Sequence, residues 1–114
     1  MHKNQNLLQA TKNALNGLRI LLKERSAKRE LLLVCVAIGL FCYKPNVYTV
    51  LLTVLSFTLL AVEALNTAIE KICDHLTLEI HPEIKAIKDL GAAAVFILVF
   101  AILLLFIRFL SPFA

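Results

Sequence analysis

Glu63-Ala-Leu-Asn66-Thr-Ala-Ile-Glu70-Lys-Ile-Cys-Asp74 closes a long apolar run, residues 47–65, with a line of polar side chains. Glu63, Asn66, Glu70 and Asp74 follow one another at intervals of three, four and four residues. On a helix, these four side chains fall within roughly 80° of arc and along roughly 16 Å of axis. The apolar run is long enough for a membrane span. Carboxylates at a membrane boundary are costly, so the line is a candidate functional site.

The composition is typical of an integral membrane protein. Of the 114 residues, 60% are hydrophobic, and the mean hydropathy is +0.81. The length fits one domain over residues 1–114. Ten of the twelve lysines and arginines lie before residue 30 or between residues 70 and 89. Because basic residues gather on the cytoplasmic side of a membrane, we expect the N-terminus inside and the C-terminus outside. No aromatic-interleaved basic patch indicates nucleic-acid binding.

The hydrophobic pattern predicts an all-α integral membrane fold with an N-terminal amphipathic surface helix and three transmembrane helices. The surface helix is expected at about residues 6–25 and the spans at about residues 29–44, 47–70 and 90–110. A turn at residues 44–46 joins the first two spans. Because Pro82 cannot lie inside a helix but can begin one, we expect a loop and then a short amphipathic helix before the third span. The aligned polar side chains need partners, which favours a homo-oligomer.

Depth in the membrane gives the polar residues different chemistry. Desolvation disfavours the charged form of a carboxyl group, which suits Glu63 to take a proton from a lipid hydroxyl near neutral pH. Asn66 can orient that carboxyl group or a phosphate oxygen. Glu70 and Asp74 lie further toward water, where carboxylates and substrate phosphates together can bind Mg²⁺. Glu24 is the other acid that is near enough along the basic N-terminal segment to join them.

Two readings of these residues remain open on spacing alone. A base near the lipid, a metal site nearer the water and a phosphate-binding cation are what phosphoryl transfer requires. Lys88, beside Asp89 at the start of the third span, could supply that cation. The sequence has no P-loop and no kinase-type glycine-rich motif. The alternative is a non-catalytic oligomer in which the same residues bond across helices, or a cation-conducting bundle.

At these residues the sequence resembles the prokaryotic diacylglycerol kinases, a family of small trimeric membrane enzymes. The strongest resemblance is the pattern Glu63-x-x-Asn66-Thr-Ala-Ile-Glu70-x-x-x-Asp74. Further matching elements are Gly17-Leu18-Arg19, Glu24 with Arg29-Glu30, Glu79-x-His81, and Lys88-Asp89-x-Gly91. The match spans roughly residues 10–105, so it covers most of the chain.

The resemblance implies Mg²⁺-dependent transfer of the ATP γ-phosphate to diacylglycerol, giving phosphatidate, in a homotrimer of the bacterial inner membrane whose sites form between subunits. It implies that Glu63 is the catalytic base and that Asn66 supports it. The implied metal ligands are Glu24 and Glu70. These two also belong to the implied ATP site, together with Asp74, Glu79, His81, Lys88 and Asp89. The implied lipid-binding residues are Glu63, Arg19, Glu30 and Ala92, which stands where a serine is frequent. One branch of the family phosphorylates undecaprenol, and this remains the alternative substrate.

Overall fold

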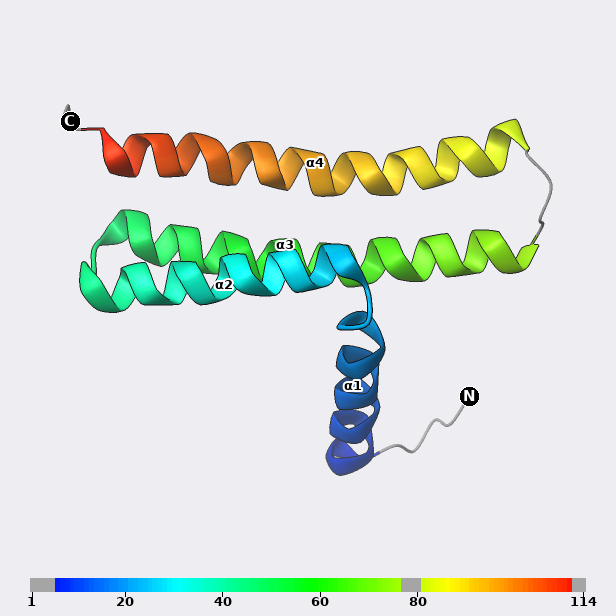
Figure 1. Cartoon of the computed structure of the whole chain (residues 1–114). Coiled ribbons are helices and arrows are strands. Elements are labelled where there is room, and N and C mark those ends of the chain that lie inside the picture. The colour runs from blue at the N-terminus through cyan, green and yellow to red at the C-terminus, as the bar shows by residue number, and fades with distance from the viewer. Residues whose placement is uncertain (1–5, 77–80, 112–114) are drawn as a thin grey trace.

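The computed structural model describes residues 6–76 and 81–111, which form four helices and no strand. These are α1 (Leu7–Leu21), α2 (Arg25–Tyr43), α3 (Val47–Leu76) and α4 (Pro82–Leu110). Helices α2, α3 and α4 run side by side, and α1 projects away from them near the start of α2 (Figure 1). Because α3 packs against both α2 and α4, it is the central helix of the fold. The all-helical prediction is confirmed for these residues.

Helix α1 is shorter than the sequence predicts. Its N-terminus is capped by the Asn6 side chain, which accepts a hydrogen bond from the Gln9 backbone N–H at 2.8 Å. It ends at Leu21 rather than near residue 25. The N–H groups of Lys23 and Glu24 bond to carbonyls three residues back, which tightens the last turn and stops the helix. Glu24 is thereby extended and becomes the residue that precedes α2.

The predicted turn between α2 and α3 is confirmed and is held by side-chain capping. The Asn46 side-chain oxygen accepts hydrogen bonds from the N–H groups of Tyr48 and Thr49 at 2.9 and 3.0 Å. The buried Thr49 hydroxyl donates to the Lys44 carbonyl at 2.9 Å. These bonds satisfy the backbone groups at the start of α3, and they make α2 and α3 antiparallel neighbours.

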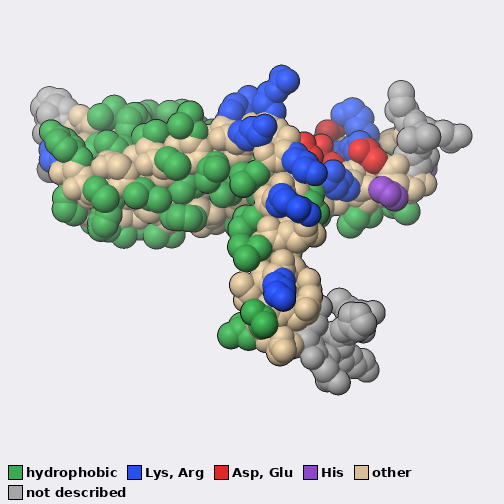
Figure 2. Space-filling view, turned by 60° about the horizontal axis from the view of Figure 1, so that its bottom comes forward, with side chains coloured by type: hydrophobic (Ala, Val, Ile, Leu, Met, Phe, Trp, Pro, Cys, Tyr) green, Lys and Arg blue, Asp and Glu red, His purple; other side chains and the backbone are tan. Residues whose placement is uncertain are grey.

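Among the described residues, two helices are long and apolar enough to cross a membrane, α3 and α4. Helix α2 has 19 residues, but its first two turns carry Arg25, Lys28, Arg29 and Glu30. Its role as a third span therefore stays a prediction. Figure 2 shows hydrophobic side chains covering the end of the bundle that lies away from α1, with charged side chains gathered near α1 and beyond it. This separation is typical of a protein that is partly inserted in lipid.

As expected, Pro82 does not lie inside a helix, because α4 begins there and continues to Leu110. The separate short amphipathic helix expected before the third span is wrong, because that segment forms the first turns of α4. Proline fits there because the first residue of a helix needs no N–H partner within the helix. The preceding His81 caps α4, since its Nδ1 accepts a hydrogen bond from the Glu83 N–H at 3.2 Å.

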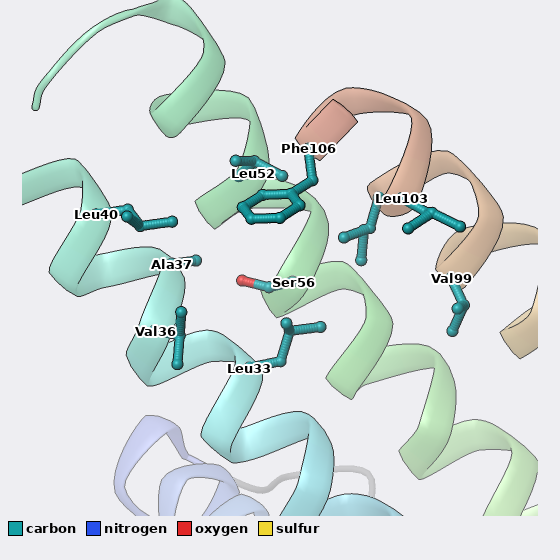
Figure 3. A pocket seen from close by; sticks show the side chains of 10 residues that line it. Leu33, Val36, Ala37, Leu40, Leu52, Ser56, Val99, Leu103 and Phe106 are labelled. Carbon is teal, nitrogen blue, oxygen red and sulfur yellow. The ribbon is translucent and has the colours of Figure 1, made fainter. Parts of the chain in front are cut away.

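The apolar core lies where α3 meets its two neighbours. Leu52 and Leu59 of α3 and Ile102 of α4 form its buried centre. Beside this centre, α2, α3 and α4 line an apolar cavity of about 280 Å³ in which Ser56 supplies a polar side chain (Figure 3). The Ser56 hydroxyl donates to the Thr53 carbonyl of its own helix at 2.8 Å. Packing of α3 between two helices thus fixes which face of α3 turns toward α2.

Candidate active site

An acidic cleft of about 270 Å³ lies where the start of α2 meets the C-terminal half of α3. We name it by its lining residues: Glu24, Ser26, Glu63, Thr67, Glu70, Lys71 and Asp74. Three of the four members of the polar line of α3 therefore open onto one space. The turn between α1 and α2 brings Glu24 to the same space from the other side. The cleft combines four carboxylates with one ammonium group.

Glu63 lies at the buried end of the acidic cleft, with only 4% of its surface exposed. Its Oε2 accepts hydrogen bonds from the Ser26 hydroxyl at 3.0 Å and the Thr67 hydroxyl at 3.3 Å. The carboxyl group of Glu30 lies within hydrogen-bonding reach of the Glu63 side chain. The Oε2 of Glu30 is buried and has no hydrogen-bond partner among the described residues. A buried carboxylate with fixed partners can accept a proton from a well-placed hydroxyl.

Asn66 connects the acidic cleft to α4. Its side-chain nitrogen donates to Glu70 Oε1 at 3.2 Å. Its side-chain oxygen is buried, has no hydrogen-bond partner in the described part of the chain, and packs against Gly91 of α4. A Cβ atom at position 91 would collide with that oxygen. Gly91 therefore permits the close approach of α4 that seats Asn66, and through it Glu70.

Two ion pairs border the acidic cleft and cross between elements. Lys71 Nζ lies 3.7 Å from Glu24 Oε1, and Lys88 Nζ donates to Asp74 Oδ1 at 2.6 Å. The first pair links α3 to the residue before α2, and the second links α3 to α4. All four side chains are substantially exposed. Exposed ion pairs contribute only about 0–1 kcal/mol, so these lysines can exchange a carboxylate for a phosphate at little cost.

A second, apolar cavity of about 520 Å³ lies between α1 and α3. Leu18 and Leu21 of α1 and Ala64 and Ala68 of α3 contribute to its wall. Thr67 and Lys71 line both this cavity and the acidic cleft. An apolar chain in the cavity would thus have its polar end beside the carboxylates.

Several predicted site residues lie elsewhere in this single chain. Arg19 is exposed on α1 and donates to Asn16 at 2.8 Å. His81 caps α4, and Asp89 accepts from Lys85 Nζ at 2.8 Å within that helix. Ala92 is exposed on α4. Glu79 lies outside the described residues.

Three residues of the acidic cleft had not been predicted as site residues: Ser26, Thr67 and Lys71. Thr67 lies four residues after Glu63, and Lys71 lies four residues after Thr67, so helical spacing places both beside the polar line. That spacing could have predicted both as site residues. Ser26 gives no such signal, because it lies in a basic segment 37 residues from its partner, and only the packing of α2 on α3 brings them together.

The described residues of the acidic cleft would bind Mg²⁺ only together with oxygen ligands from the phosphates of a nucleotide. In the described part of the chain, no group of three or more His, Cys, Asp or Glu side chains could hold a metal ion. Mg²⁺ is commonly bound by one or two carboxylates, with substrate phosphates and water completing its shell. Glu24 and Glu70 both line the cleft and satisfy that smaller requirement.

The sequence matches the family model for prokaryotic diacylglycerol kinase over residues 12–110. The chain belongs to the prokaryotic diacylglycerol kinase family. The diacylglycerol kinase of Haemophilus influenzae is 35% identical over 94 residues, which cover 80% of this chain and 80% of that protein. The resemblance found in the sequence is therefore confirmed, and the chain is a kinase. Membership of the prokaryotic diacylglycerol kinase family removes the support for a non-catalytic or cation-conducting bundle.

Proposed function

We propose that this chain transfers the γ-phosphate of ATP to the hydroxyl of diacylglycerol, giving phosphatidate and ADP, in a Mg²⁺-dependent reaction. One observation carries the proposal. The buried carboxyl group of Glu63 lines the acidic cleft, and this cleft shares Thr67 and Lys71 with the apolar cavity between α1 and α3. A lipid whose hydroxyl lies at the head of an apolar chain fits this junction better than a soluble alcohol.

Glu63 would act as the general base. It takes the proton of the lipid hydroxyl while the hydroxyl oxygen forms a bond to the γ-phosphorus. The bond from that phosphorus to the β-phosphate oxygen breaks, and ADP leaves. Glu30 lies beside Glu63, where it can contact the glycerol end of the lipid. Arg19 and Ala92 complete the proposed lipid-binding set, and Asn66, which donates a hydrogen bond to Glu70, is the proposed supporting residue.

The carboxylates nearer water would hold the nucleotide. Glu24 and Glu70 would bind Mg²⁺ together with phosphate oxygens, and the bound ion would neutralise charge on the transferring phosphoryl group. Lys88 now pairs with Asp74 at the edge of the acidic cleft and could bind a phosphate in its place. The other residues proposed for the ATP site are Asp74, Glu79, His81 and Asp89.

The proposed assembly is a homotrimer in the bacterial inner membrane, with the N-terminus in the cytoplasm and the C-terminus in the periplasm. In such an assembly, residues that lie away from the acidic cleft of their own chain can reach the cleft of a neighbour. This would place Arg19, Asp89 and Ala92 at a shared site. The ten basic residues before residue 30 and between residues 70 and 89 support this orientation.

A side-by-side lipid assay tests the proposal. Purified protein in mixed micelles would receive γ-labelled ATP with diacylglycerol or undecaprenol, with and without Mg²⁺. We expect labelled phosphatidate, formed only with Mg²⁺. Preferential labelling of undecaprenol would leave the proposed mechanism unchanged and would show that undecaprenol, the alternative substrate, is the preferred lipid. Absence of any lipid product from a folded oligomer would contradict the proposed kinase function of this site.

A further inference from the structure

Two hydroxyl groups hold the same oxygen of Glu63. Ser26 reaches it from the first turn of α2 at 3.0 Å, and Thr67 reaches it from the next turn of α3 at 3.3 Å. Both donate to Oε2, so one oxygen of the carboxyl group is hydrogen-bonded to residues of two helices. The other oxygen, Oε1, takes part in neither of these two bonds. Hydrogen bonds to a charged group are stronger than those between neutral groups, so the two bonds fix the side chain firmly.

The bonding of Ser26 and Thr67 differs from that of other hydroxyl groups in the fold. Ser56 and Thr58 of α3 each donate to a backbone carbonyl of their own helix at 2.8 Å. Thr53 does so as well, and it also donates to the Ala37 carbonyl of α2 at 3.3 Å. Such bonding to carbonyls is the usual way for a helical serine or threonine to satisfy its hydroxyl. Ser26 and Thr67 instead donate to a carboxylate side chain. Their hydroxyls are therefore directed at Glu63.

Glu63 has an acidic neighbour that could compete for these donors. The carboxyl group of Glu30 lies beside it, and Glu30 Oε2 has no hydrogen-bond partner among the described residues. The two hydroxyl donors bond to Glu63 and hold its carboxyl group in one orientation beside this second acidic group. A reacting group must be held to a fraction of an ångström for efficient transfer.

We propose that Ser26 and Thr67 are positioning residues that hold Glu63 Oε2, so that Oε1 receives the proton of the lipid hydroxyl. The inference rests on the proposed role of Glu63 as the base. Neither residue touches the reacting phosphate in this role. Both act through Glu63, so their loss should lower the rate of the chemical step and leave nucleotide binding nearly unchanged.

Substitutions that remove each hydroxyl test this role. Ser26→Ala and Thr67→Val should each lower kcat by roughly tenfold or more, since each removes one hydrogen bond to a charged group. The KM for ATP should stay within about twofold, because these side chains do not hold the nucleotide. Ser26→Thr keeps a hydroxyl and should restore most of kcat. Thr58→Val makes the same change in α3 at a hydroxyl that bonds its own helix, and it should keep wild-type kcat.

Either of two kinetic results would overturn the proposal: wild-type kcat in Ser26→Ala, or a Ser26→Thr variant as slow as Ser26→Ala. Absence of lipid phosphorylation would count against the proposed function and not against the contact of Ser26 with Glu63. In that case a thermal measurement tests the contact itself. Ser26→Ala and Glu63→Leu, each alone and together, would be compared by Tm. Shifts that do not add would support the contact between the two side chains, and strictly additive shifts would contradict it.

Discussion

Glu63 and Glu70 lie on one face of α3, but their surroundings differ. Glu63 is buried at the inner end of the acidic cleft between two hydroxyl donors. Glu70 is exposed and has one amide partner, Asn66. Two turns of helix therefore separate a carboxyl group suited to a lipid hydroxyl from one suited to a hydrated ion. Position along one helix would be enough to divide the two proposed tasks.

Changing Glu70 to glutamine should weaken the binding of Mg²⁺-ATP by about tenfold or more, because the change removes a charged oxygen ligand and keeps the side chain's size. Titration calorimetry of the purified protein with ATP in the presence of Mg²⁺ would measure the Kd. Glu83→Gln is the matched control, since Glu83 is an exposed acid in the first turn of α4. Equal Kd values for the wild type and Glu70→Gln would count against metal ligation at Glu70.

At the scale of helices, the contact between α3 and α4 depends on a single missing side chain. Gly91→Ala would place a Cβ against the Asn66 side chain, whose Cγ would lie at 3.3 Å. Overpacking of this kind costs about 1–3 kcal/mol, so we expect a lower Tm. Gly39→Ala in α2 adds its Cβ to open space and should leave Tm unchanged or raise it slightly. Thermal unfolding in detergent would compare them. A Gly91→Ala variant as stable as the wild type would show that the helices can separate freely there.

Periodicity was sufficient to place the polar line of α3, because helix geometry alone sets which side chains share a face. It could not place Ser26 against Glu63, since that contact depends on how α2 packs on α3. Glu24 was expected near the line from its place in the chain and from the family resemblance. The interruption expected at Pro82 is confirmed, since proline is well tolerated as a first residue and α4 begins there. The separate short helix was wrong, because the same helix continues into the third apolar stretch.

At the scale of the whole molecule, most of α4 is not covered by the rest of the chain. In its most apolar stretch only 6% of the residues are buried, and large side chains such as Phe96 and Ile97 are exposed. Lipid can cover such a surface, and so can further copies of the chain. Exposed Arg19, Asp89 and Ala92 lie where a neighbouring chain could use them.

We expect the protein to assemble as three copies. Native mass spectrometry from detergent micelles should give a mass three times that of the chain, whose own mass is 12.7 kDa. Cross-linking in lipid bilayers would check that the assembly is not produced by detergent. A monomer that is fully active in both settings would contradict the proposal that sites are shared between subunits.

The central claim is that Glu63 removes the proton of the lipid hydroxyl, and the Glu63→Gln variant tests it most directly. The decisive measurement is the rate of phosphatidate formation by this variant, made together with its Kd for ATP in the presence of Mg²⁺. We predict that turnover falls by at least about a hundredfold, as expected when a general base is lost, and that the Kd changes little. Turnover close to that of the wild type would contradict the assignment of Glu63 as the base.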